Sequence, residues 1–147
     1  MEPADLAAAW MRMCSSGDMA MFAKLTAAAF ACHGPGGTGT AADFLNWLAW
    51  YPTAFAGQQA RVNDVFAAGD RVAFRYTVIS TYRGGFLGLP ADGHQVREEG
   101  IVIFRLDGGR VAELWYQGND LQIARQLGGH VTASAGQSPS VTTRNMA

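Results

Sequence analysis

Apolar residues near the N-terminus recur with the period of an α-helix. They occupy positions i, i+3, i+4 and i+7 and therefore share one helical face. These residues are Leu6, Ala9, Trp10 and Met13, and the helix is expected to end near residues 15–17. Asp18 then suits the N-cap of a second helix, whose apolar face contains Phe22 and Leu25. The chain is therefore predicted to begin with two helices.

A glycine-rich segment, HGPGGTGT at residues 33–40, interrupts this pattern. Gly and Pro at such density disfavour a regular element, and loops of this kind often border functional sites. We predict a loop that leads into a third helix. That helix carries aromatic residues at helical spacing from Phe44 to Tyr51, and Pro52 disfavours its continuation.

From Arg61 onward the apolar residues alternate with a period of two, which is typical of strands with one buried face. Gly-Asp, Gly-Gly and Asp-Gly pairs separate the alternating runs and suit turns. The predicted strands lie near residues 60–67, 71–82, 94–106 and 110–118. Because LDGGR at 106–110 is typical of a hairpin turn, the last two strands are expected to pair antiparallel.

A short helix is predicted directly after Asp120, with Gly128 as its left-handed C-terminal cap. The final segment, residues 131–147, is rich in Ser and Thr, and we expect it to be a disordered tail. Residues 1–130 then form one domain, because a chain of 147 residues can bury one substantial core.

The composition argues against several classes of protein. Hydrophobic residues make up 49% of the chain and charged residues 16%, so the chain should fold and keep apolar surface for a pocket or a partner. A net charge of -1 gives no electrostatic footprint for nucleic acid. Cys14 and Cys32 lack the spacing of a zinc site or a disulfide framework. With no signal sequence and no apolar run near the roughly 20 residues of a membrane span, we expect a soluble, cytoplasmic protein.

Four sequence fragments in a fixed order carry a family resemblance. They are GDRVAFRY at 69–76, YRGGFLGLP at 82–90, GIVIF at 100–104, and ELW at 113–115 through RQLG at 125–128. Together with the order of predicted elements, they resemble the SnoaL-like polyketide cyclases, a branch of the nuclear-transport-factor-like cone folds, over residues 5–128. The resemblance implies an α+β fold in which helices pack on a curved antiparallel sheet and form a cone with an internal pocket.

The end of the last predicted strand holds the first catalytic candidates. Members of the family commonly place an aspartate, as general acid/base, four residues after the tryptophan that matches Trp115, and this chain has Asn119 there. An amide cannot transfer a proton at neutral pH, but it can hold a carbonyl or hydroxyl group. Asp120 turns inward only if the strand ends or bulges at Gly118; alternatively, Asn119 or Asp120 caps the last helix. If Trp115 points into the cone, Gln117 and Asn119 do so as well.

Epoxide hydrolases of polyether type within the family use two carboxylates. The resemblance places these at Cys32 and Asn63, neither of which is an acid, although His33 and Asp64 stand beside them. Adjacent strand residues face opposite sides, so this displacement argues against that mechanism. His33 either carries protons near neutral pH or fixes the loop.

Glu98 and Glu99 are neighbours on a predicted strand and must face opposite sides. They cannot form the paired carboxylates of acid/base hydrolysis, and at least one is expected to be solvated. Tyr76 shares a strand face with Phe74 and either presents its hydroxyl to the pocket or belongs to the core. The aromatic residues of the third helix leave the same two alternatives open.

These observations lead to the hypothesis of a secondary-metabolism enzyme, a cyclase or isomerase, that acts on an apolar polyketide-like intermediate without cofactor or metal. Ring closure would rest on acid/base help or on conformational preorganisation, as in a cycloaddition. The alternatives are an epoxide hydrolase or epoxide-opening cyclase, and a non-catalytic ligand-binding protein. The resemblance also implies a homodimer. The predicted catalytic residues are Asp120, Asn119, Gln117, Tyr76 and His33, and the predicted substrate-binding residues are Trp115, Trp47, Tyr51, Asp64, Phe74 and Phe86.

Overall fold

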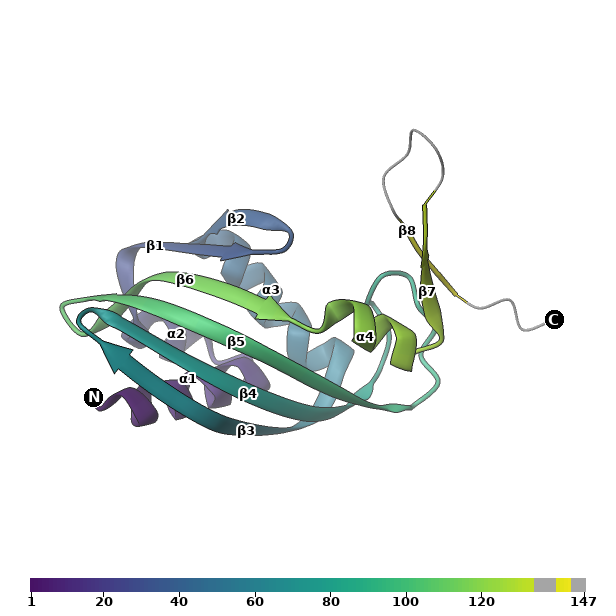
Figure 1. The fold of residues 1–147 in the computed structure, drawn as a ribbon, viewed down its shortest axis with the longest axis horizontal. Coiled ribbons are helices and arrows are strands. Elements are labelled where there is room, and N and C mark those ends of the chain that lie inside the picture. The colour runs from purple at the N-terminus through teal and green to yellow at the C-terminus, as the bar shows by residue number, and fades with distance from the viewer. Residues whose placement is uncertain (134–139, 144–147) are drawn as a thin grey trace.

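The computed structural model describes residues 1–133 and 140–143 (Figure 1). Its helices are α1 (Pro3–Ser16), α2 (Met19–Leu25), α3 (Ala41–Ala54) and α4 (Asp120–Gln126). Its strands are β1 (Thr26–Gly34), β2 (Gly37–Thr40), β3 (Phe55–Ala68), β4 (Arg71–Tyr82), β5 (Gln95–Asp107), β6 (Arg110–Gly118), β7 (Gly129–Thr132) and β8 (Ser140–Thr143). The predicted α+β class is confirmed.

The N-terminal helices form where local sequence signals place them. Helix α1 ends at Ser16, and Gly17 takes the left-handed conformation (φ 70°) that glycine adopts without steric cost. The Asp18 carboxylate accepts a hydrogen bond from the Met21 amide (2.9 Å) and caps α2, as predicted. Helix α3 continues two residues beyond Pro52, since a proline in the last turn removes only one helical hydrogen bond.

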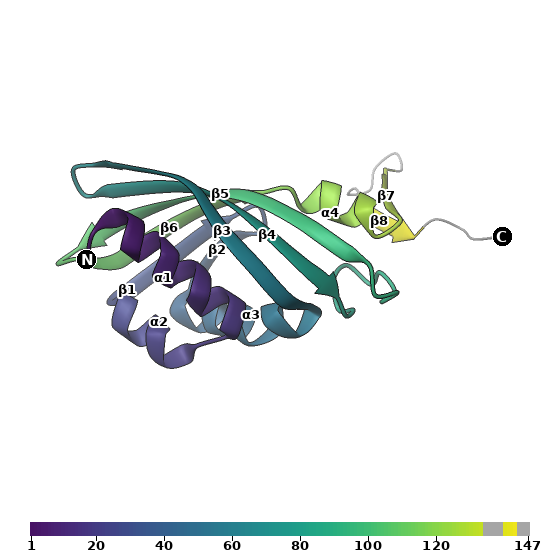
Figure 2. The same cartoon turned by 90° about the horizontal axis from the view of Figure 1, so that it is seen from below.

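A curved, six-stranded sheet forms the second layer, in the order β2-β1-β6-β5-β4-β3. Helices α1, α2 and α3 lie on one face of this sheet, and α4 lies beyond the end of β6 (Figure 2). The predicted hairpin between the last two long strands is confirmed, with Asp107 paired to Arg110. All pairings are antiparallel except that of β1 with β6, which is parallel and makes the sheet mixed.

The glycine-rich segment is not only a loop. Residues 26–34 and 37–40 form the hairpin β1-β2, which closes one edge of the sheet. The run TAAA at 26–29 offers almost no alternation of size or polarity, and the parallel partner of β1 lies far away in the sequence. The strand is therefore set by tertiary contacts and not by its own pattern.

The segment predicted to be a disordered tail contains strand residues in its described part. Residues 131 and 132 are the last two residues of β7 (129–132). This strand pairs antiparallel with β8 (140–143) at the α4 end of the domain (Figure 1). Residues 134–139 and 144–147, which the same prediction covers, lie outside the described residues.

Alternation along β5 separates the core from the outer sheet face. Phe104 points inward, is fully buried, and packs on Trp10 of α1 (ring centroids 4.9 Å apart) and on Phe74 of β4 (5.3 Å). Its neighbour Ile103 points outward and remains 39% exposed. Aromatic packing of Phe104 against Trp10 thus joins the helical layer to the sheet.

Truncation of Phe104 should destabilise the fold far more than truncation of Ile103. Phe104→Ala leaves a cavity between α1 and the sheet and is expected to lower the free energy of unfolding by about 3–5 kcal/mol. Ile103→Ala on the outer face should cost about 1 kcal/mol or less. Urea unfolding of both variants tests this, and equal losses would contradict the assigned layers.

Candidate active site

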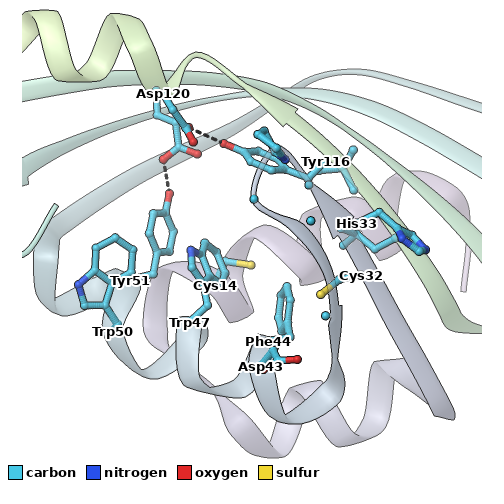
Figure 3. A pocket seen from close by; sticks show the side chains of 18 of the residues that line it. Cys14, Cys32, His33, Asp43, Phe44, Trp47, Trp50, Tyr51, Tyr116 and Asp120 are labelled. Carbon is cyan, nitrogen blue, oxygen red and sulfur yellow. Dashed lines mark hydrogen bonds between the residues drawn. The ribbon is translucent and has the colours of Figure 1, made fainter. Parts of the chain in front are cut away.

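A cavity of about 490 Å³ lies between the sheet and helices α1 and α3, with the β1-β2 hairpin at its rim (Figure 3). Its wall is largely aromatic and includes Trp10, Phe44, Trp47, Trp50, Phe55 and Phe86. Trp47 and Tyr51 stack on successive turns of α3, with ring centroids 4.4 Å apart. Among the described residues that line the cavity, none is a lysine or an arginine. The cavity therefore suits an apolar, unsaturated molecule.

The polar end of the cavity is built around Glu98. Its side chain extends from β5 on the inward face, and both oxygens accept hydrogen bonds from tyrosines. Tyr51 of α3 donates to Oε1 (2.6 Å), and Tyr76 of β4 donates to Oε2 (2.5 Å). Burial raises the pKa of Glu98; the two phenol hydrogen bonds oppose this shift, and the charge of Asp120 adds to it.

Asp120 reaches the same end of the cavity from the first turn of α4. Strand β6 ends at Gly118, and the chain then turns so that the Asp120 carboxylate accepts a hydrogen bond from Tyr116 (3.1 Å; Figure 3). Asn119 occupies the N-cap position of α4, but its side chain makes no capping hydrogen bond. The sequence alternative in which either residue serves only as a cap is therefore not what the structure shows.

Two paired glycines leave room for the tyrosine rings. Gly100 of β5 lies opposite both Tyr76 of β4 and Gly118 of β6. A Cβ atom on Gly100 would lie 2.6 Å from the Tyr76 hydroxyl, and one on Gly118 would lie 2.0 Å from the Tyr116 hydroxyl. No side chain larger than hydrogen fits at either position unless a ring moves, so the glycines set where the phenols lie.

The three phenols act as hydrogen-bond donors in this setting. Burial, and then the nearby charge of Glu98, raises the pKa of Tyr51, Tyr76 and Tyr116 well above the usual range for tyrosine. Each ring therefore stays protonated across the physiological range. The site combines two carboxylates, which can exchange protons, with neutral donors that can polarise a carbonyl group.

His33 lies at the cavity rim, but its ring is engaged outside the carboxylate cluster. Its Nε2 atom lies 2.7 Å from Glu113, its Nδ1 atom lies 3.0 Å from Thr38, and the ring stacks on Trp115 (5.3 Å). The hydrogen bonds from His33 and Arg105 lower the pKa of Glu113. His33 thus ties the β1-β2 hairpin to β6.

Only some of the site residues predicted from the sequence line the cavity. Those that line the cavity are Asp120, Tyr76, Tyr51, Trp47 and Phe86, with His33 at the rim. Gln117, Trp115 and Asn119 do not line it, because Leu114 and Tyr116 are the β6 residues that point inward. Trp115 therefore does not face the cone, and Gln117 and Asn119 do not point into it either.

Two further candidates for substrate binding also lie elsewhere. Asp64 forms an exposed ion pair with Arg75 (2.7 Å) and does not line the cavity. Phe74 is buried in the core beside Phe104, where the space is already filled. Asn63, the other position matched to an epoxide hydrolase acid, donates a hydrogen bond to Thr77.

Sequence reasoning missed Glu98 and Tyr116. Both fall on the apolar phase of their strands, Glu98 between Val96 and Gly100 and Tyr116 two residues after Leu114. An acid on the buried phase of an amphipathic strand was the available signal. This signal was missed because glutamates are generally expected to be solvated.

Other kinds of site can be checked against the described part of the chain. Within residues 1–133 and 140–143, no three His, Cys, Asp or Glu side chains are grouped so that they could hold a metal ion. No helix in these ranges is long and apolar enough to span a membrane.

Comparison with known proteins places this architecture in a family. The family model described as SnoaL-like polyketide cyclase matches residues 4–127. IdmH from Streptomyces antibioticus, a candidate polyketide cyclase, superposes with a TM-score of 0.76 at 25% identity, covering 87% of this chain and 99% of IdmH. AclR from Streptomyces galilaeus, a candidate hydroxylase, gives 0.74 at 25% identity, covering 86% of this chain and 83% of AclR.

A candidate polyketide cyclase from Acidithiobacillus ferrooxidans has the same fold, with a TM-score of 0.75 at 23% identity over 85% of this chain and 93% of its own. No curated protein matches the sequence significantly. The family match spans the helices, the long strands and the cavity described above. The chain therefore belongs to the SnoaL-like polyketide cyclase family.

Proposed function

We propose that this protein is a cyclase or isomerase of secondary metabolism, as in antibiotic biosynthesis, that closes a ring in an apolar polyketide-like intermediate without a cofactor. The observation that carries the proposal is the Glu98 carboxyl group, held by two tyrosine hydroxyls in an aromatic cavity with Asp120 nearby. Family membership supports the reaction class.

Glu98 has the properties of an acid/base group. Its raised pKa makes the carboxylate a stronger base and lets the carboxylic acid persist to higher pH than in an exposed glutamate. In the proposed reaction, Glu98 takes a proton from a carbon that lies between two carbonyl groups of the substrate. The resulting enolate carbon attacks a second carbonyl carbon, a C–C bond forms, and the new alkoxide oxygen receives a proton. No atom is gained or lost.

Tyr76, Tyr51 and Tyr116 have supporting roles in this mechanism. A phenol that hydrogen-bonds a substrate carbonyl stabilises the negative charge that develops on its oxygen. Asp120, bonded to Tyr116 on the far side of the cavity from α3, is the second proton carrier (Figure 3). Its charge also disfavours ionisation of Glu98, which keeps the proton available for return to the product.

The aromatic wall supplies the remaining contribution. A flexible chain of carbonyl groups must fold before its reacting carbons meet, and a cavity of about 490 Å³ restricts the conformations it can adopt. Trp47 and Trp50 offer flat surfaces for conjugated segments of the substrate. Preorganisation and acid/base catalysis therefore act together.

An epoxide hydrolase remains a weaker second candidate. A protonated carboxyl group and tyrosine donors can also activate an epoxide oxygen, and Glu98 with Asp120 supplies two acids for that reaction. Cys32 lies at the rim and Asn63 outside the cavity, so the acid positions implied by the resemblance are not used. Turnover of a terpene or polyether epoxide in place of poly-β-ketones would favour this candidate.

We also propose that the protein is a cytoplasmic homodimer. The outer face of the sheet exposes apolar side chains, with Ile101 50% exposed and Ile103 39% exposed. A second copy that packs on this face would remove them from water. Light scattering of the purified protein measures the mass in solution directly.

Glu98→Gln should abolish most of the activity without unfolding the protein. The amide keeps hydrogen-bonding capacity toward the tyrosines but cannot exchange a proton, so kcat for a linear poly-β-ketone is expected to fall about 10²–10⁴-fold. Glu99→Gln is the matched control, because Glu99 is the adjacent residue on the exposed side of β5. Equal rates for Glu98→Gln and wild type would rule out the acid/base role.

The raised pKa of Glu98 also predicts how stability depends on pH. A carboxyl group whose pKa is higher in the folded than in the unfolded state contributes stability at low pH, and this contribution is lost as pH rises through the folded-state pKa. The Glu98→Gln variant has no carboxyl group at this position and therefore does not lose this stability as pH rises. The free energy of unfolding of the variant, relative to wild type, should therefore increase with pH in urea titrations from about pH 4 to 8. A flat or decreasing difference would contradict the assigned pKa shift.

A further inference from the structure

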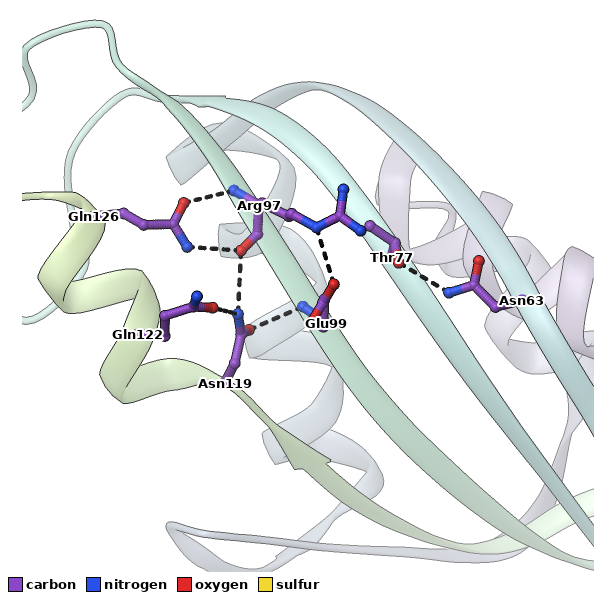
Figure 4. Close-up of polar contacts among 7 residues, drawn as sticks. All are labelled: Asn63, Thr77, Arg97, Glu99, Asn119, Gln122 and Gln126. Carbon is purple, nitrogen blue, oxygen red and sulfur yellow. Dashed lines mark hydrogen bonds and ion pairs between the residues drawn. The ribbon is translucent and has the colours of Figure 1, made fainter.

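The junction between β6 and α4 is fastened to β5 by an asparagine side chain (Figure 4). Asn119 Oδ1 accepts a hydrogen bond from the Glu99 amide (2.9 Å), and its Nδ2 donates to the Arg97 carbonyl (3.2 Å). The Asn119 amide also donates to the Glu99 carbonyl (3.1 Å). Asn119 thus pairs with β5 after the strand β6 has ended at Gly118.

A second amide, one helix length further on, contacts the same stretch of β5. Gln126 Oε1 accepts from the Arg97 amide (2.8 Å), and Nε2 donates to the Arg97 carbonyl (2.9 Å; Figure 4). Both ends of α4 are therefore attached to the backbone of β5. The two side chains take the place of strand pairing that β6 no longer provides.

The stretch that these amides hold carries Glu98. Residues 97 and 99 accept and donate the hydrogen bonds, while the side chain of residue 98 between them lies in the cavity. Asn119 directly precedes Asp120. One set of bonds therefore fixes the backbone next to both carboxylates of the cavity.

We propose that Asn119 and Gln126 are positioning residues that hold Asp120 and Glu98 at a fixed separation. This inference rests on the proposed acid/base function of the two carboxylates. Neither amide lines the cavity, so neither acts on the substrate directly. A displacement of about 1 Å at a reacting group can cost about 100-fold in rate, which makes such fastening functionally significant.

The chemistry of the amide group explains why residue 119 is not an acid. The position needs one donor, for the Arg97 carbonyl, and one acceptor, for the Glu99 amide. A carboxylate offers acceptors only, so an aspartate here would place an anionic oxygen against the Arg97 carbonyl. The same requirement applies to Gln126, which also donates and accepts.

The test compares Asn119→Ala and Asn119→Asp with a control of equal charge, Gln122→Glu. Gln122 is an exposed residue of α4 that accepts a hydrogen bond from Asn119 and, within the described part of the chain, makes no hydrogen bond to β5 (Figure 4). Full-length protein is labelled with 3-fluorotyrosine, whose four ¹⁹F resonances are assigned by Tyr→Phe substitution. Tyr116 reports on Asp120 through its hydrogen bond, and Tyr82, bonded to the Leu89 carbonyl, serves as the remote reference.

Both Asn119 variants should shift the Tyr116 resonance and leave that of Tyr82 unchanged. Their kcat should fall about 10–100-fold with KM within about threefold of wild type, because substrate binding is preserved while the reacting groups are displaced. Gln122→Glu should resemble wild type in both measurements. Gln126→Ala should reproduce the Asn119→Ala result in weaker form.

Two results would overturn the proposal. One is an unchanged Tyr116 resonance with unchanged kcat in Asn119→Ala. The other is movement of all four resonances, which would mean that Asn119 supports the fold in general. A failure of the acid/base function would look different: Glu98→Gln and Asp120→Asn would retain full turnover, while the Tyr116 resonance would still respond to Asn119→Ala.

Discussion

Glu98 places an ionisable carboxyl group inside an apolar, aromatic cavity, where water cannot fully solvate its charge. Among the described residues that line this cavity, no lysine or arginine neutralises it, and the hydrogen bonds come from the neutral phenols of Tyr51 and Tyr76. Neutral donors reduce the cost of ionisation without cancelling it, so both the acid and the carboxylate remain accessible. A cation at this position would instead hold the group permanently ionised. Hydrogen bonding of Glu98 to neutral phenols, and not to a cation, therefore suits proton exchange at this carboxyl group.

The surrounding architecture serves to bring those phenols to the carboxyl group. Tyr76 crosses β5 at Gly100, and Tyr116 passes over Gly118, two positions where a side chain would collide with the rings. Aromatic packing of α3 against the sheet carries Tyr51 to the same point. The end of β6 then allows the chain to turn so that Asp120 approaches from α4. Secondary structure, glycine placement and polar chemistry thus converge on one end of the cavity.

Local signals predicted much of the fold but only part of the site. Caps, periodicity and the Asp-Gly turn predicted the early helices, the β5-β6 hairpin and the short helix after Asp120, since each depends on neighbouring residues alone. Strand β1 was missed because its parallel pairing with β6 is invisible in its small-residue sequence. Trp115 was assigned inward because alternation fixes which residues share a face, not which face is buried. Its ring instead lies beside His33 and under the Arg71 guanidinium.

The most direct test of this account is a ¹³C NMR titration of the Glu98 side-chain carboxyl group in the folded protein. The resonance is assigned by its absence from Glu98→Gln. We expect Glu98 to titrate clearly above the unperturbed glutamate pKa of about 4.3, and to titrate lower in Asp120→Asn, which removes a nearby negative charge. A Glu98 that titrates at or below the usual value would contradict the claim that its burial in the cavity prepares it for acid/base catalysis.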